Sequence, residues 1–174
     1  DTVLITGASG GVGSALIQLA NRRGAKCVAL CGAGKADAVK AVGPLAVIDR
    51  ASANLGSALH DAIGKDSVDV VADVVGGVLW PQLINALTRG GRYTCAGAIG
   101  GPIVEFDLRT FYLRDLTFTG ATVPPPGVFQ DLIGYIERDE IQPLLAATYP
   151  LEELHTAQQA FIDKRHVGNI VVEP

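Results

Sequence analysis

The chain has 174 residues, of which 48% are hydrophobic and 18% charged, a composition typical of a folded protein with one sizeable core and not of a disordered segment. Its formal net charge is −4, and no cluster of lysine and arginine breaks this balance, which argues against a nucleic-acid partner. The apolar segments are short and are interrupted by Asp, Arg or Gly, so none approaches the roughly 20 residues that a membrane-spanning helix needs.

Short apolar runs alternate with amphipathic segments through most of the chain. Strands are expected at 2–6, 26–31, 45–49, 68–75, 92–97 and 116–122. Helices are expected at 11–23, 35–42, 53–63, 79–88 and 128–138, with a long loop between the last two strands. Strands that alternate with helices predict parallel crossover units. Six such strands predict an α/β fold with a doubly wound, parallel six-stranded sheet over residues 1–140.

Residues 141–174 have a different pattern and are interpreted as a small C-terminal extension rather than a second full domain. A short apolar segment at 146–149 is followed by an expected helix at 152–162 and a last strand at 169–172. Because Asp1 stands directly before the first predicted strand, we expect the chain to be a domain of a longer protein.

The three cysteines, Cys27, Cys31 and Cys95, fall inside predicted strands. Their odd number and their positions do not fit a disulfide framework, and neither CxxC spacing nor neighbouring histidines indicate a zinc site. We therefore expect buried thiols, no metal site and a cytoplasmic protein.

A glycine-rich turn follows the first predicted strand and opens the first predicted helix. Residues 8–13, Ala-Ser-Gly-Gly-Val-Gly, fit the pattern G-x-G-x-x-G with alanine in the first place. Gly10 would let the backbone approach a diphosphate, Gly13 would let the helix pack on the strand, and free N–H groups at the helix start would attract the phosphates. This context predicts a Rossmann dinucleotide-binding domain. Residues 6–13 also fit the turn of short-chain dehydrogenases, but no tyrosine here is followed four residues later by that family's lysine.

The end of the second predicted strand indicates which nicotinamide cofactor is bound. An NAD-binding turn usually has Asp or Glu there, about 20 residues after the glycines, to accept the ribose hydroxyls. Here residues 30–35 read Leu-Cys-Gly-Ala-Gly-Lys, and the next carboxylate is Asp37. The amides of Gly32 to Gly34 and Lys35 favour a 2′-phosphate, and Arg50, after the third strand, could reach the same phosphate or lie over the adenine. We therefore expect NADP (NADPH) in preference to NAD.

Several segments together resemble the cofactor-binding half of the medium-chain dehydrogenase/reductase superfamily, which is zinc-type alcohol dehydrogenase-like, and especially its quinone-oxidoreductase-like branch. These segments are residues 3–20 with the glycine turn, 68–77 with its double glycine, Gly-Gly-Arg at 90–92 and the last strand at 168–172. In that family a catalytic domain precedes this half, so the resemblance implies that residues 141–174 pack on a domain that this chain does not contain. The chain has Gly168-Asn169 where the family often has Gly-Lys.

The resemblance also implies where a cofactor would lie, from the pyrophosphate through the adenosine to the nicotinamide. The predicted cofactor-binding residues are, in that order, Ser9, Gly10, Gly11 and Val12; Gly32, Lys35 and Arg50; and Gly76, Gly77, Gly97, Ala98, Ile99, Gly120, Ala121 and Thr122. The last group also lies at the carboxyl ends of the fourth, fifth and sixth predicted strands, where open parallel sheets bind ligands.

The function implied by the resemblance is NAD(P)H-dependent hydride transfer to a small-molecule substrate, namely a quinone, enal, enone or related carbonyl compound. No acid or base of this chain stands out as catalytic, so we expect the isolated domain to be inactive or weakly active. Asp73 is expected to accept hydrogen bonds from local backbone amides, and the three histidines to be solvated or at helix ends. A non-catalytic NADPH-binding sensor, or an interaction domain without a ligand, stays open as an alternative.

The sixth predicted strand bears on assembly. Residues 114–120 would form an exposed sheet edge, and exposed edges need covering. In the superfamily this edge often pairs with its copy in a second subunit, so we expect a homodimer.

Overall fold

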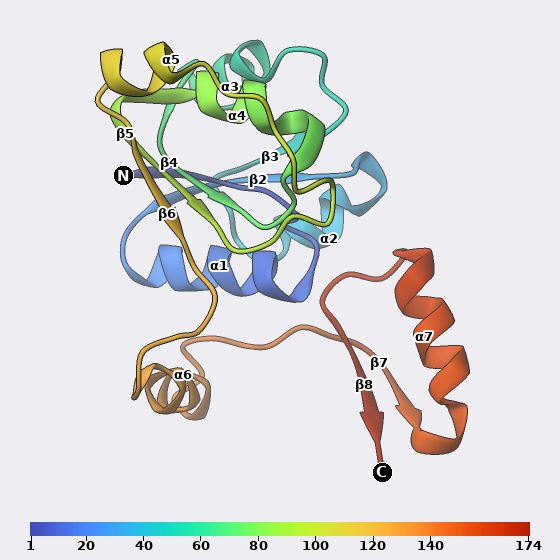
Figure 1. Cartoon of the computed structure of the whole chain (residues 1–174). Coiled ribbons are helices and arrows are strands. Elements are labelled where there is room, and N and C mark those ends of the chain that lie inside the picture. The colour runs from blue at the N-terminus through green and yellow to red at the C-terminus, as the bar shows by residue number, and fades with distance from the viewer.

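The computed structural model describes residues 1–174 as a six-stranded sheet and a separate two-stranded sheet (Figure 1). The strands of the larger sheet are β1 (Thr2–Ile5), β2 (Lys26–Cys31), β3 (Ala46–Asp49), β4 (Val68–Asp73), β5 (Leu87–Cys95) and β6 (Thr117–Gly120). Its helices are α1 (Gly11–Arg22), α2 (Ala36–Lys40), α3 (Leu55–Ile63), α4 (Trp80–Asn85) and α5 (Leu108–Leu113). The C-terminal part contains α6 (Val128–Glu137), β7 (Leu145–Pro150), α7 (Leu154–Asp163) and β8 (Asn169–Glu173). Short 3-10 turns are η1 (Ala33–Lys35), η2 (Gly77–Leu79) and η3 (Leu151–Glu153).

The strands of the larger sheet lie in the order β3-β2-β1-β4-β5-β6, and every neighbouring pair is parallel. This order confirms the predicted doubly wound sheet. Val3 of β1 pairs with Cys27 on one side and with Val70 of β4 on the other, so the strand order reverses between β1 and β4. In sheets of this kind, ligands bind outside the carboxyl ends of the strands at the reversal point.

Two buried clusters cover the two faces of this sheet. On the face of α1 and α2, Ile17 and Val39 are completely buried against β1 and β2. On the opposite face, which α3, α4 and α5 cover, Leu59 and Leu83 are completely buried (Figure 1). Because both faces are covered, β2 is apolar along almost its whole length, and burying a side chain the size of Val28 or Leu30 contributes about 1.5–3 kcal/mol to folding.

The helix predicted at 79–88 is wrong at its end. α4 stops at Asn85, and β5 already begins at Leu87, which pairs with Val68 of β4. The register of this pairing then shifts before Val70 pairs with Arg92. Gly90 and Gly91, which follow the predicted helix in the sequence, therefore lie inside β5, where the pairing is irregular.

The long loop predicted between the fifth and sixth strands is also wrong, because it contains α5. Asp107 caps this helix by accepting the N–H of Arg109 at 2.9 Å. Phe111 of α5 packs on Phe118 of β6, with ring centroids 4.9 Å apart. A helix of six residues is too short to show a helical period in the sequence.

The C-terminal unit, residues 145–173, consists of β7, α7 and β8. The two strands are parallel, and the helix connects them (Figure 1). The predicted helix at 152–162 and the strand at 169–172 correspond to α7 and β8. None of the helices in the structure has both the length and the apolar character required to span a bilayer.

Candidate functional site

The turn between β1 and α1 has a geometry suited to a phosphate group. Gly7 has a φ of 57°, and the N–H of Gly10 donates to its carbonyl oxygen at 2.9 Å, which closes the turn. Gly10 is the extended N-cap of α1; no side chain caps the helix, and its first turn contains no acidic residue. A Cβ on Gly13 would collide with the Gly7 carbonyl and lie 2.7 Å from the Cα of Ala8, so only glycine lets α1 pack this closely. The uncapped amides at the start of α1 therefore fit a diphosphate.

Asn169, at the start of β8, lies directly against this turn. A Cβ on Gly11 would overlap the Oδ1 of Asn169, whose Nδ2 donates to the carbonyl oxygen of Leu144 at 3.2 Å. Beside it, the N–H of Gly168 donates to the carbonyl oxygen of Ser9 at 2.9 Å. Sequence reasoning missed Asn169 as a neighbour of the turn, and the available signal was its position, where the family often has lysine.

Basic side chains gather at the carboxyl ends of β2 and β3, where the adenosine end is predicted. A Cβ on Gly32 would lie 3.8 Å from the Nε of Arg50, so these two residues are neighbours. Burial, the charge of Arg50 and, more weakly, that of Lys164 lower the pKa of Lys35. The structure thus brings together the three predicted residues. Lys164 of the C-terminal unit, which no sequence motif indicated, is near enough for its charge to act on Lys35, while its Nζ lies 3.4 Å from the ring centroid of Phe161.

Two glycine-rich loops at the ends of β4 and β5 pack backbone against backbone. Gly76 and Gly77 have φ values of 65° and 72°. The N–H of Gly100 donates to the carbonyl oxygen of Val75 at 2.7 Å, which joins the two loops. A Cβ on Gly97 would lie 2.9 Å from a carbonyl oxygen of the β4 loop, and one on Gly77 would overlap Gly100. Side chains at these positions would force the loops apart.

These loops and the end of β6 border one open, mostly apolar pocket of about 320 Å³. Three predicted residues from three strand ends line it, namely Gly76, Ala98 and Gly120, together with Trp80, Tyr93, Cys95, Gly101, Pro102, Val104, Phe118 and Thr119. The N–H of Ala121 donates to the carbonyl oxygen of Cys95 at 2.9 Å, so the chain beyond β6 stays beside β5. Ile99 and Val12, also predicted, lie outside this lining with 78% and 58% of their surface exposed.

Asp73, at the carboxyl end of β4, is only 1% exposed. Its Oδ1 accepts the Thr6 hydroxyl at 2.5 Å and the N–H of Val75 at 2.8 Å, and its Oδ2 accepts the Tyr93 hydroxyl at 2.6 Å. The N–H of Gly76 donates to both oxygens, at 3.1 and 3.2 Å. The prediction that Asp73 accepts local amides is confirmed, but sequence reasoning missed its contacts with Thr6 and Tyr93. Burial, and then the bond to Asp73, raise the pKa of the Tyr93 hydroxyl.

The remaining candidate acids, bases and metal ligands are dispersed. No group of three or more His, Cys, Asp or Glu side chains in the structure is arranged to hold a metal ion. Cys27 and Cys31 are free and buried, and burial raises the pKa of both thiols. His166 lies shortly after the end of α7, one of the two settings expected for the histidines, but its Nδ1 is buried without a hydrogen-bond partner and its ring lies 5.8 Å from that of Phe161.

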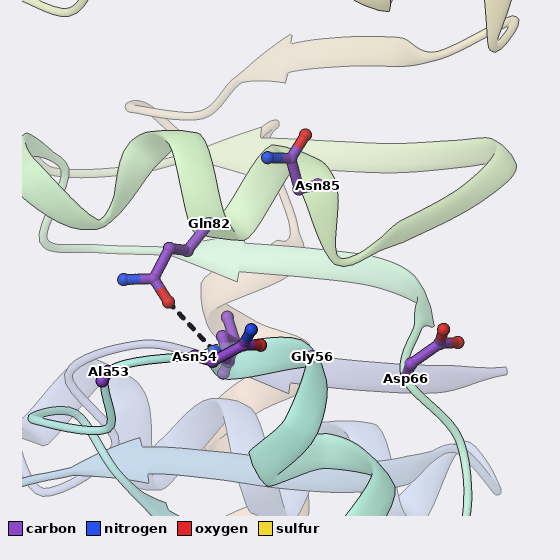
Figure 2. A pocket seen from close by; sticks show the side chains of 7 residues that line it. Ala53, Asn54, Gly56, Asp66, Gln82 and Asn85 are labelled. Carbon is purple, nitrogen blue, oxygen red and sulfur yellow. Dashed lines mark hydrogen bonds between the residues drawn. The ribbon is translucent and has the colours of Figure 1, made fainter.

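A polar pocket of about 440 Å³ lies between α3 and α4 (Figure 2). It is lined by Ala53, Asn54, Leu55, Gly56, Asp66, Gln82 and Asn85. The Oε1 of Gln82 accepts the N–H of Leu55 at 3.0 Å, as the dashed line shows, and the Oδ1 of Asn54 accepts the N–H of Ser57 at 2.9 Å. These polar groups cap the start of α3, and the pocket shares no residue with the predicted cofactor site.

Comparison with known proteins identifies the class to which this fold and site belong. The family model described as zinc-binding dehydrogenase matches residues 11–138. The chain belongs to the zinc-binding dehydrogenase family, and its fold is that of the cofactor-binding half of a medium-chain dehydrogenase/reductase. The resemblance inferred from the sequence is thereby confirmed.

Two curated relatives are similar to the chain over nearly all of its length. The acryloyl-coenzyme A reductase of Metallosphaera sedula is 30% identical over 174 residues, which cover 99% of this chain and 50% of the relative. The quinone oxidoreductase of Rattus norvegicus is 28% identical over 171 residues, which cover 93% of this chain and 51% of the relative. The chain therefore spans about half the length of these relatives.

Two solved structures have the same fold. A crystal structure from Sinorhizobium meliloti 1021, described as that of a candidate alcohol dehydrogenase, is 49% identical with a TM-score of 0.96 and covers 100% of this chain and 48% of that one. The 2-octenoyl-CoA carboxylase reductase CinF, solved with NADP and 2-octenoyl-CoA, is 28% identical with a TM-score of 0.90 and covers 98% of this chain and 43% of that one.

Proposed function

We propose that this chain is the cofactor-binding part of an NADPH-dependent reductase, whose longer form transfers hydride to a quinone, enal, enone or related carbonyl compound. The uncapped glycine turn carries the proposal, because it follows β1 at the point where the strand order reverses. The names of the curated relatives support it, since they put a conjugated thioester and quinones among the candidate substrates.

The chain's own residues would bind and orient the cofactor, which supplies the hydride when bound. The amides at Gly11 and Val12 and the dipole of α1 would hold the pyrophosphate. The loops at Gly76, Ala98 and Gly120 would leave room for the nicotinamide, and the apolar lining of their pocket would exclude water. The proton for the product would come from water or from a part of the longer protein outside these residues.

NADPH is the proposed cofactor because residues 30–35, at the end of β2 where an NAD-binding domain usually has a carboxylate, contain none, and because Lys35 and Arg50 lie at this edge of the sheet. The NADP complex of CinF supports this choice. We expect Arg50→Gln to weaken NADPH binding about tenfold, the effect of one charge-assisted hydrogen bond, and to leave NADH binding within about twofold. Lys40→Gln is the matched control, because Lys40 pairs with Asp37 at 2.9 Å on the surface of α2. Equal losses for NADPH and NADH would contradict the assignment.

Three further proposals concern the longer protein. Residues 141–174 would pack on its preceding domain, because the C-terminal unit exposes apolar side chains here.

The chain would form a homodimer through residues 114–120, since β6 is an edge strand with β5 as its one neighbour in the sheet. Light scattering should give the mass of two copies, and a monomer at high concentration would contradict the dimer. A cytoplasmic location stays a prediction from the cysteine pattern.

The central test is a titration with NADPH, followed by cofactor fluorescence and thermal unfolding. At a free NADPH concentration of about 100 Kd, binding should stabilise the fold by about 2.7 kcal/mol, which raises the Tm by about 5–10 °C. The longer protein should then oxidise NADPH in the presence of quinones or enones. Binding without turnover would instead support a sensor, and no response at millimolar NADPH would favour an interaction domain without this ligand.

A further inference from the structure

The loop after β4 has a backbone conformation that needs support from outside the loop. Gly76 combines a φ of 65° with a ψ of −154°, a conformation that is almost confined to glycine. Glycine also has more conformational freedom to lose on folding than any other residue, so the loop does not hold this shape by itself. The support comes from Asp73, whose two oxygens both accept the N–H of Gly76.

The loop after β5 is held through the first loop. The carboxylate of Asp73 accepts a hydrogen bond from the N–H of Val75 at 2.8 Å, and the carbonyl oxygen of Val75 accepts one from the N–H of Gly100 at 2.7 Å. A Cβ on Gly76 would lie 3.0 Å from the carbonyl oxygen of Gly101, so the two backbones are in close contact. A shift of the Asp73 carboxylate would therefore move both loops.

The same carboxylate relates these loops to the phosphate turn. Thr6 directly precedes Gly7, and its hydroxyl donates to Asp73 at 2.5 Å while its oxygen accepts the N–H of Val74 at 3.0 Å. Tyr93 of β5 donates to the other oxygen at 2.6 Å. One buried side chain thus connects β1, β4 and β5 at the edge where the cofactor is proposed to bind.

We infer that Asp73 is a positioning residue that sets the two loops proposed to border the nicotinamide. The inference rests on the proposed function. Asp73 lies beneath the loops and acts on the bound cofactor through the amides of Val75 and Gly76. It therefore governs how well the nicotinamide end fits, and not the adenosine end, which lies at β2 and β3.

The test compares Asp73→Asn with Asp69→Asn in the whole chain. Asparagine offers one acceptor oxygen where the carboxylate offers two, so at least one of the donors around Asp73 loses its partner. We expect Asp73→Asn to raise the Kd for NADPH about tenfold and to leave the Kd for 2′,5′-ADP, which corresponds to the adenosine half, within about twofold. Asp69 is on the same strand and accepts the N–H of Thr2 at 2.7 Å at the opposite end of β4, so Asp69→Asn should change neither Kd.

A second pair of variants covers the case in which Asp73→Asn does not fold. Thr6→Val removes the hydroxyl between Asp73 and Val74, and should weaken the binding of NADPH more than the binding of 2′,5′-ADP. Thr6→Ser restores the hydroxyl and should bind both ligands as the unsubstituted chain does. Equal weakening of both ligands, or an equal effect of Asp69→Asn, would overturn the inference while the proposed function stands. Failure of the unsubstituted chain to bind NADPH would overturn both.

Discussion

The six-stranded sheet and the C-terminal unit are made of the same kinds of element but bury their apolar side chains to different extents. In the sheet, Ile17, Leu59 and Leu83 are completely buried between strands and helices. In the C-terminal unit, Phe161 and Ile162 are 52% and 65% exposed. An open apolar groove of about 510 Å³ between α7 and β8 is lined by Leu154, Ala157, Gln158, Phe161, Ile162, Ile170 and Val172. The sheet is therefore stabilised by its own core, whereas the unit finds few apolar partners within these residues.

Residues 135–142, which precede the C-terminal unit, make polar contacts with α1, and Ile141 among them is only 3% exposed. Gln18 of α1 and the backbone of Gln142 exchange two hydrogen bonds, at 2.9 and 2.8 Å. Arg22 pairs with Glu140 and lies 3.9 Å from the ring centroid of Tyr135. Exposed pairs of this kind contribute about 0–1 kcal/mol each, so the C-terminal unit should open locally at a lower free energy than the sheet.

The largest expected effect comes from shortening a buried side chain in the sheet, in comparison with an exposed one in the C-terminal unit. Leu83→Ala removes a completely buried side chain from the sheet and should lower the free energy of unfolding by about 2–5 kcal/mol. Ile162→Ala shortens a side chain that is 65% exposed and should cost less than about 1 kcal/mol. Urea unfolding of both variants measures the difference. Similar losses would show that the C-terminal unit shares the stability of the sheet.

A smaller effect is expected at Gly13, where the packing of α1 on the turn after β1 leaves no room for a methyl group. Gly13→Ala places a Cβ against the carbonyl oxygen of Gly7 and should cost about 1–3 kcal/mol, despite the better helix propensity of alanine. Gly34→Ala is the control, because a Cβ there meets nothing within 4 Å, and its stability should stay within about 0.5 kcal/mol. Thermal unfolding of the two variants checks the comparison. A stable Gly13→Ala would mean that the turn is looser than its geometry indicates.

The sheet was predictable because its information is local in the sequence. β2 is a run of buried residues bounded by a glycine turn on either side, and the glycines at 10–13 mark the start of α1. The two errors come from short elements whose boundaries depend on distant partners. Leu87 belongs to a strand because Val68 pairs with it, and α5 exists because its aromatic side chains pack on β6.

The candidate site was predictable in its glycines but not in the residues that surround them. Glycine at a strand end indicates a close backbone approach, and the structure has such approaches at Gly13, Gly76 and Gly97. Asn169 and Lys164 reach the same region from the far end of the chain, and no local pattern encodes that return.

Tyr93→Phe probes the hydrogen bonds around Asp73, at the carboxyl ends of the strands. The variant loses the hydroxyl that donates to Asp73 at 2.6 Å, and at pH 7 the free energy of unfolding should fall by about 1–2 kcal/mol. Because the folded pKa of Tyr93 lies above its ordinary value of 10.0, the hydroxyl stabilises the fold fully below that pH and loses this effect as the pH rises further. The gap between the unsubstituted chain and Tyr93→Phe should therefore shrink above about pH 10. Tyr112→Phe, at an exposed position, should show no such gap at pH 7.

The smallest expected change, Gln18→Ala, tests the link between the two regions directly. Losing both hydrogen bonds to Gln142 should cost less than about 1 kcal/mol in global unfolding but should speed amide exchange in β7 and β8 about threefold or more. Asn21→Ala is the matched control on the same helix, because its amide donates to the carbonyl oxygen of Gly43 at 2.8 Å and not to the C-terminal part. Exchange in β8 that is equally slow in both variants would mean that the contact between Gly168 and Ser9 holds the unit without Gln18. The phosphate turn itself, rather than the flank of α1, would then join the two regions, and binding at that turn should slow exchange in β8.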